Sequence, residues 1–239
     1  MQINPYESPT ISSGPQASAL QLDPTSDEHR RHATRMLRKL AVIRVGDAIL
    51  MVSIVVLGLA QFFTEPTFKS FSTLSSTVGF ALIAAALAMT HVGLVLVVAV
   101  PGDHRSPVIF ALVLQVIATI GVASFIVRVI QLQFVGGLLP LFGAAAFAML
   151  LTSQAIVALV IRTIASQYQL VDGIQWSYGA VIGYALCATV ASSWSLHVIP
   201  PVIPPRIVLT CMCVFALAGT ASRFHAISVL RSRTNSNGF

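Results

Sequence analysis

The sequence predicts an all-α membrane protein, a polytopic bundle of about six transmembrane helices with both chain ends in the cytoplasm. Three observations carry this prediction: 56% of the 239 residues are hydrophobic, only 9% are charged, and the apolar residues gather into long runs. A soluble domain carries about a quarter of its residues as Asp, Glu, Lys and Arg, because its surface faces water. This chain has too few charges to cover such a surface, so its composition favours the bilayer.

Six apolar runs are long enough to cross the hydrocarbon core, which needs about 20 helical residues. We expect the spans at residues 40–63, 78–100, 107–129, 138–161, 178–198 and 206–226. The fourth is the least defined, because residues 129–161 contain no charge and exceed one crossing; its preceding connector is expected within 131–137. The sixth is short between Arg206 and Arg223, and both arginines are expected to extend toward opposite headgroup layers.

The segments around this transmembrane domain, residues 40–230, differ from it in composition. Residues 1–24 are rich in Ser, Pro and Gln and have no apolar periodicity, so they predict a disordered cytoplasmic tail. Residues 25–39 predict a basic juxtamembrane helix, since Thr25 and Glu28 have the spacing of a capping box. Residues 231–239 are expected to form a second cytoplasmic tail.

The distribution of Lys and Arg predicts the orientation. With the amino terminus inside, eleven of these residues fall on the inner face and three on the outer face, namely Lys69, Arg128 and Arg206. Positive residues favour the cytoplasmic side, so both termini are expected there. The net charge of +6 lies beside the spans, which favours the lipid bilayer as partner over nucleic acid. Cleavage of a signal peptide before Gln61 is the less favoured alternative, because the preceding polar segment is too long.

Small side chains recur every four residues along the fifth span. They are Gly179, Gly183, Cys187, Ala191 and Ser195, and on a helix they form one stripe. Helices in lipid associate through close backbone approach, so the stripe predicts a packing seam. The seam either joins the fifth span to a neighbouring helix of the same chain, which we favour, or forms the face of a homodimer.

Ionisable groups at membrane depth are costly and are often functional. Arg44 and Asp47 are three residues apart near the inner end of the first span, and this helical spacing predicts that they pair with each other. The alternative is a proton or ion relay. The pair is the simpler interpretation, because no second carboxylate lies at comparable depth in another span.

His91 is the one histidine deep in a predicted span. An imidazole can accept protons near neutral pH or bind a metal, but a hydrogen bond to a neighbouring helix is the interpretation we favour. Gln115 in the third span and Gln154 in the fourth are the expected partners, since each carries a polar group that needs satisfying in hydrocarbon.

The sequence offers little support for enzymatic chemistry or a cofactor. It contains no HExxH zinc motif, GxSxG elbow, P-loop or dinucleotide fingerprint. Cys211 and Cys213 are soft metal ligands, but residues two apart on a helix do not face each other. We therefore expect neither catalysis nor a bound metal or cofactor.

Residues 4–9 read NPYESP. This stretch resembles the Asn-Pro-Tyr-x-Ser-Pro tag near the start of many uncharacterised multi-pass membrane proteins of bacteria. The resemblance covers six residues and implies a bacterial inner, or cytoplasmic, membrane location without an activity. The Asn-Pro-x-Tyr endocytic signal has different spacing, because Tyr6 here follows Pro5 directly.

Two functions from different classes follow from these patterns. The first is a non-enzymatic scaffold or accessory subunit that binds a membrane-protein partner or a second copy through the fifth span. The alternative is a transporter or channel for an ion or small solute, with a polar path near Asp47 and His91. The two differ in whether the intramembrane polar residues meet in one water-accessible cavity or lie in separate helix contacts.

Overall fold

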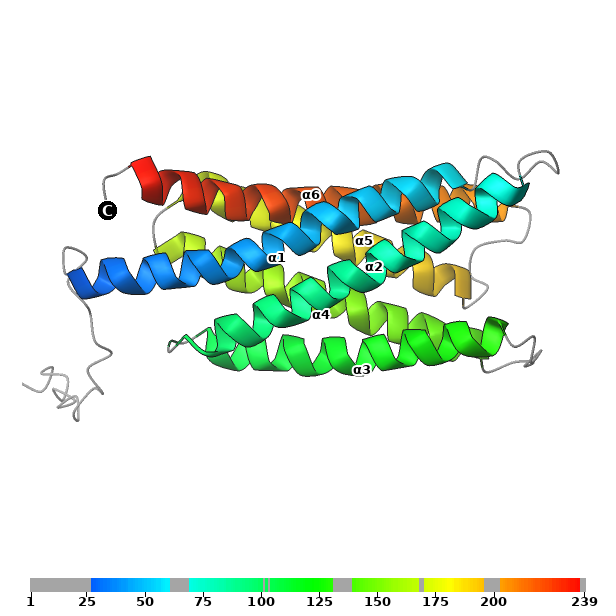
Figure 1. Cartoon of the computed structure of the whole chain (residues 1–239), viewed down its shortest axis with the longest axis horizontal. Helices are drawn as coiled ribbons and strands as arrows, with labels where there is room; N and C mark the ends of the chain where they lie inside the picture. Colours follow the sequence, from blue (N-terminus) through cyan, green and yellow to red (C-terminus); the bar gives the residue numbers. More distant parts are fainter. Residues whose placement is uncertain are drawn as a thin grey trace, which may run out of the picture.

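The computed structural model describes residues 27–60, 69–100, 102, 104–130, 139–167, 170–195 and 203–236, and these residues are helical apart from short ends and turns (Figure 1). The described helices are α1 (Asp27–Ala60), α2 (Lys69–Val98), α3 (Arg105–Ile130), α4 (Leu139–Gln167), α5 (Val171–Ser195) and α6 (Pro205–Ser236). Each contains a segment long and apolar enough to span a membrane, 20 to 27 residues in length. The predicted all-helical, six-span fold is therefore confirmed.

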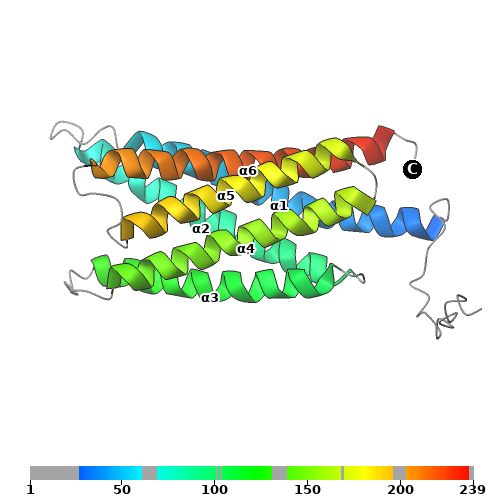
Figure 2. The same ribbon diagram turned by 180° about the vertical axis from the view of Figure 1, so that it is seen from behind.

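The helices follow one another around the bundle in chain order. Each packs against the next, and α6 returns to pack against α1. Figure 2 shows α6, α5, α4 and α3 succeeding one another across the back, whereas α1 and α2 cross the front in Figure 1. The least extensive of these neighbour contacts is between α2 and α3. The start of α1 and the end of α6 lie at the same end of the bundle, which we call the terminal end.

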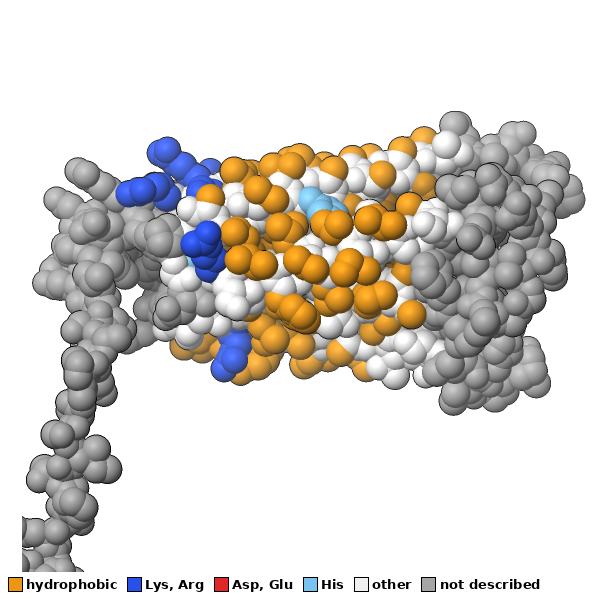
Figure 3. Space-filling view, turned by 90° about the horizontal axis from the view of Figure 1, so that it is seen from below, with side chains coloured by type: hydrophobic (Ala, Val, Ile, Leu, Met, Phe, Trp, Pro, Cys, Tyr) orange, Lys and Arg blue, Asp and Glu red, His pale blue; other side chains and the backbone are white. Residues whose placement is uncertain are grey.

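The outer surface of the described bundle has the character of a lipid-facing surface. Large exposed apolar side chains occur along every helix; examples are Val52, Phe80, Ile120, Leu159, Ile182 and Val214. Figure 3 shows an apolar band on one face, with Lys and Arg side chains gathered at one end of it. An apolar exterior of this extent in water would promote aggregation, whereas lipid tails solvate it.

A close-packed apolar core fills the bundle toward the terminal end. It combines α1, α2, α3, α4 and α6 through side chains that include Leu40, Leu94, Val108, Ile161 and Ile227. All five are almost completely buried. This core excludes water from the part of the bundle that lies between the terminal end and the middle of the spans.

Several helix ends differ from the predicted span limits. The basic segment and the first span form one continuous helix from Asp27, because nothing in residues 27–39 interrupts helical propensity. Helix α5 begins at Val171 rather than near residue 178, with Asp172 in its first turn, where a carboxylate complements the helix dipole. Helix α6 continues to Ser236. The expected tail 1–24 and the connector 131–137 lie outside the described residues.

Candidate functional site: a buried ion pair in the membrane

A fully buried ion pair joins the first and last helices. The Nε of Arg223 donates to both carboxylate oxygens of Asp47, at 3.1 Å each, and its Nη2 donates to Oδ1 of the same carboxylate. Both side chains have no exposed surface. Asp47 and Arg223 each lie well inside the apolar segments of α1 and α6, so the pair sits at membrane depth.

Three further side chains complete this ion-pair cluster, which we define as Asp47, Gln154, Tyr184, Thr220 and Arg223. The Nη1 of Arg223 donates to Oε1 of Gln154 on α4. The guanidinium carbon lies 5.4 Å from the centre of the Tyr184 ring on α5, within the range of a cation–π contact. The Tyr184 hydroxyl donates to Oγ1 of Thr220 at 3.2 Å. Four helices are therefore connected through one guanidinium group.

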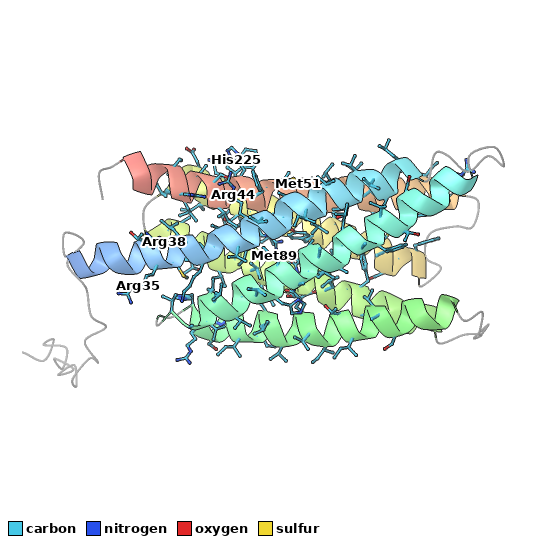
Figure 4. The ribbon with its side chains drawn as sticks, viewed as in Figure 1. Arg35, Arg38, Arg44, Met51, Met89 and His225 are labelled. Carbon is cyan, nitrogen blue, oxygen red and sulfur yellow. The ribbon has the colours of Figure 1, made fainter. Side chains whose placement is uncertain are left out.

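The predicted pairing of Arg44 with Asp47 is wrong. Asp47 faces the interior and takes Arg223 as its partner, whereas the Arg44 guanidinium lies 4.6 Å from the centre of the Phe224 ring. Figure 4 places Arg44 where α1 and α6 meet, in the same region as His225. A planar guanidinium can bind a carboxylate through two parallel donors, a geometry that Arg223 reaches from the facing helix. The expectation that Arg223 extends to a headgroup layer is therefore also wrong.

A second group of polar residues joins α2, α3 and α4; we call it the histidine cluster, and it consists of His91, Gln115 and Ser153. Gln115 Nε2 lies 3.3 Å from His91 Nδ1, which lies 2.7 Å from the carbonyl oxygen of Leu87. Ser153 donates to the carbonyl oxygen of Ala111 at 2.8 Å and lies 3.4 Å from Gln115 Oε1. The predicted partnership of His91 with Gln115 is confirmed, whereas Gln154 belongs to the ion-pair cluster.

The two clusters are adjacent along α4, where Ser153 and Gln154 follow each other in the chain. Consecutive helical residues point about 100° apart, so these two side chains serve different helix contacts. Within the part of the chain that the structure describes, no three His, Cys, Asp or Glu side chains gather in a way that could hold a metal ion. Both clusters connect neighbouring helices.

The small-residue stripe of α5 packs against α6 of the same chain. A Cβ added to Gly183 would lie 2.6 Å from the backbone nitrogen of Gly219, and one added to Gly179 would lie 3.1 Å from Oγ of Ser222. The thiol of Cys187 donates to the carbonyl oxygen of Met212 at 3.4 Å. Ala191 is buried, and the side chain of Ser195 lies outside the described set. The intramolecular seam is the arrangement found at Gly179, Gly183 and Cys187.

Comparison with known protein families, curated proteins and solved structures finds no match to this chain.

Proposed function

We propose that this chain is a non-enzymatic integral protein of the bacterial cytoplasmic membrane and acts as a scaffold or accessory subunit. One observation carries the proposal: the intramembrane charges of Asp47 and Arg223 neutralise each other across the bundle. Polar groups that transport a solute have to become available to it, whereas these are already engaged in joining helices.

The surroundings of the ion-pair cluster support the same proposal. Toward the terminal end lies the close-packed apolar core described above. In the opposite direction the neighbouring side chains are overwhelmingly apolar, among them Ile54, Leu151 and Met212. A conducting path needs polar groups along its length, and the described side chains on the two sides of the cluster are mainly apolar.

The transport alternative receives less support from the geometry. Its candidates separate into two clusters on different helix contacts, with Arg44 lying over Phe224 outside both. A relay needs titratable partners in series, and no hydrogen bond between described residues joins the two clusters.

The proposal predicts a stable partner and no conductance. Affinity purification of the full-length protein from native membranes in mild detergent should recover a membrane protein in fixed stoichiometry. Proteoliposomes containing the purified chain should show proton and ion fluxes no higher than protein-free vesicles. A flux that is lost when Asp47 and Arg223 are jointly replaced by Leu and Met, with abundance unchanged, would contradict the proposal and favour transport.

The orientation is the second testable part of the proposal. Seven of the nine described Lys and Arg side chains belong to helix segments near the terminal end; they are Arg35, Arg38, Lys39, Arg44, Arg105, Arg162 and Arg231. Figure 4 labels Arg35 and Arg38 there. Under the positive-inside rule this end faces the cytoplasm. A cytoplasm-active reporter such as green fluorescent protein should fluoresce when fused after Phe239, and alkaline phosphatase at the same position should be inactive. The reverse pattern would overturn the orientation.

A further inference from the structure

Arg44 carries a positive charge inside the apolar part of the bundle. It lies ten residues into the apolar segment of α1, which extends from Thr34 to Leu59. Its guanidinium lies over the ring of Phe224, and Phe224 comes eight residues before Ser232, where the apolar segment of α6 ends. Eight helical residues correspond to about 12 Å. The charge therefore lies below the headgroups of the leaflet at the terminal end.

No described carboxylate neutralises this charge. Asp47 is bound to Arg223, and Asp172 is exposed in the first turn of α5. Between described residues, the guanidinium of Arg44 takes part in neither an ion pair nor a hydrogen bond. Its contact with Phe224 is a cation–π interaction, which provides no negative charge. An arginine at membrane depth needs a counter-ion, so the structure calls for an anion from outside the described chain.

Two further hydrogen-bond donors lie on the same side of the bundle. His225 follows Phe224 on α6, is exposed, and lies in the same region as Arg44 (Figure 4). Trp176 on α5 is 42% exposed, and its ring centre lies 4.5 Å from that of His225. The ring N–H groups of Trp and His donate hydrogen bonds, and Trp is enriched where membrane proteins meet the headgroups. We call Arg44, Trp176 and His225 the headgroup site.

The position of the headgroup site selects a lipid as the source of the anion. A water-soluble anion would have to leave water and enter the apolar band, whereas the phosphates of the bilayer already lie at the end of that band. In an α-helix the side chains lean toward the amino terminus, and α1 begins at the terminal end, so Arg44 leans toward these phosphates. Local thinning of the bilayer further reduces the distance between an intramembrane arginine and a phosphate.

The net charge of the lipid should matter as well as its phosphate. A planar guanidinium binds a phosphate through two parallel N–H donors. In a zwitterionic lipid the phosphate is accompanied by its own cation, so adding Arg44 leaves a net positive charge at this depth. An anionic lipid contributes one negative charge and neutralises Arg44 one to one.

We propose that the headgroup site binds an anionic phospholipid of the leaflet at the terminal end, with its phosphate accepting hydrogen bonds from the Arg44 guanidinium. The site goes beyond the scaffold function and depends neither on it nor on the orientation of the chain. A ligand that binds only the folded state stabilises it by mass action, so the stability of the bundle should depend on the charge of the surrounding lipid.

The test compares two lipid compositions. The full-length protein is placed in nanodiscs of phosphatidylcholine alone, or with about a third of it replaced by phosphatidylglycerol, and its unfolding temperature is measured. Phosphatidylglycerol should raise that temperature by about 2–4 °C, which corresponds to a roughly fivefold preference. The increase should persist at about 1 M salt, where the Debye length is about 3 Å and attraction to exposed basic side chains is screened. Equal unfolding temperatures in the two compositions, or an increase that disappears in salt, would overturn the proposal.

Three variants separate the headgroup site from the general positive charge of the terminal end. Arg44→Gln should abolish the effect of phosphatidylglycerol, whereas Arg44→Lys should keep part of it, because lysine retains the charge without the planar fork. Arg162→Gln is the matched control, since Arg162 is exposed and makes the same kind of contact, 4.7 Å from the centre of the Tyr178 ring. It should preserve the effect.

The difference between the two lipid compositions is taken within each variant, so a general change in stability cancels. In detergent without phospholipid, Arg44→Gln should unfold close to the unmodified protein, which separates loss of the lipid from damage to the fold. A phosphatidylglycerol effect that survives Arg44→Gln, or that Arg162→Gln removes to the same extent, would refute the site.

Discussion

Replacing Asp47 with Ala, with Arg223 retained, is expected to destabilise the bundle by about 3–5 kcal/mol. The substitution leaves a guanidinium with no exposed surface and no counter-ion in the interior. It also frees the Nε and Nη2 donors, whose hydrogen bonds go to Asp47. The loss should be measured as the shift in unfolding of the purified protein in mixed micelles with increasing sodium dodecyl sulfate.

A double substitution separates the effect of the two charges on stability from the effect of the volume that the two side chains fill. Asp47→Leu with Arg223→Met removes both charges and keeps most of the volume, and buried pairs replaced in this way are often neutral or more stable. We expect the double variant to recover most of the stability that Asp47→Ala loses. Gln154 then loses its partner for Oε1, which limits the recovery.

Arg44→Met is the matched control for the ion pair. Arg44 is half-buried on the same helix, and the interaction described for it is a cation–π contact with Phe224, worth about 0.5–1 kcal/mol at exposed sites. If Arg44→Met proved as damaging as Asp47→Ala, the predicted pairing of Arg44 with Asp47 would regain support and the Asp47–Arg223 pair would lose its central role.

The partner of Asp47 was accessible to sequence reasoning but required a different argument. Arg223 lies seventeen residues after Arg206 in a chain segment that stays helical and apolar to Ser232. A helix of that length places Arg223 inside the bilayer, where an arginine needs a carboxylate. Asp47 is the one carboxylate within the predicted spans. The predicted sixth span ends near Arg223, which places this arginine at a headgroup layer. Arg44 then remains as the nearest cation for Asp47, and the sequence predicts the wrong pair.

The general architecture was predictable because it depends on composition and helix periodicity. The six spans follow from apolar runs, and the α5–α6 seam follows from small residues spaced by four. The apolar cavity lined by residues of α1, α2, α4, α5 and α6 was not predictable, because it forms where side chains from five helices leave a common space unfilled. A single sequence does not contain the helix order that brings Leu50, Phe147 and Leu209 together.

Gly183→Leu is expected to prevent α5 and α6 from packing and to cost about 3 kcal/mol or more, the upper end of the usual cost of overpacking. A Cβ at this position would already lie 2.6 Å from the nitrogen and 2.7 Å from the Cα of Gly219. Both are backbone atoms, so the clash cannot be relieved by a side-chain rotation, and the helices have to separate. Separation would also move Tyr184 and Thr220, which come from these two helices and hydrogen-bond to each other in the ion-pair cluster.

A graded series makes the seam testable without relying on one severe substitution. Gly183→Ala should be clearly destabilising, whereas Gly219→Ala should be milder, because its Cβ would meet Tyr184 atoms at 3.2 Å. Gly58→Ala is the matched control, since a Cβ there meets nothing within 4 Å and alanine favours the helix by about 1 kcal/mol. Unfolding midpoints should rank Gly58→Ala above Gly219→Ala, and Gly219→Ala above Gly183→Ala. A stable Gly183→Leu monomer that only loses self-association would instead assign the stripe to a homodimer, because an intramolecular seam cannot be disrupted without loss of the fold.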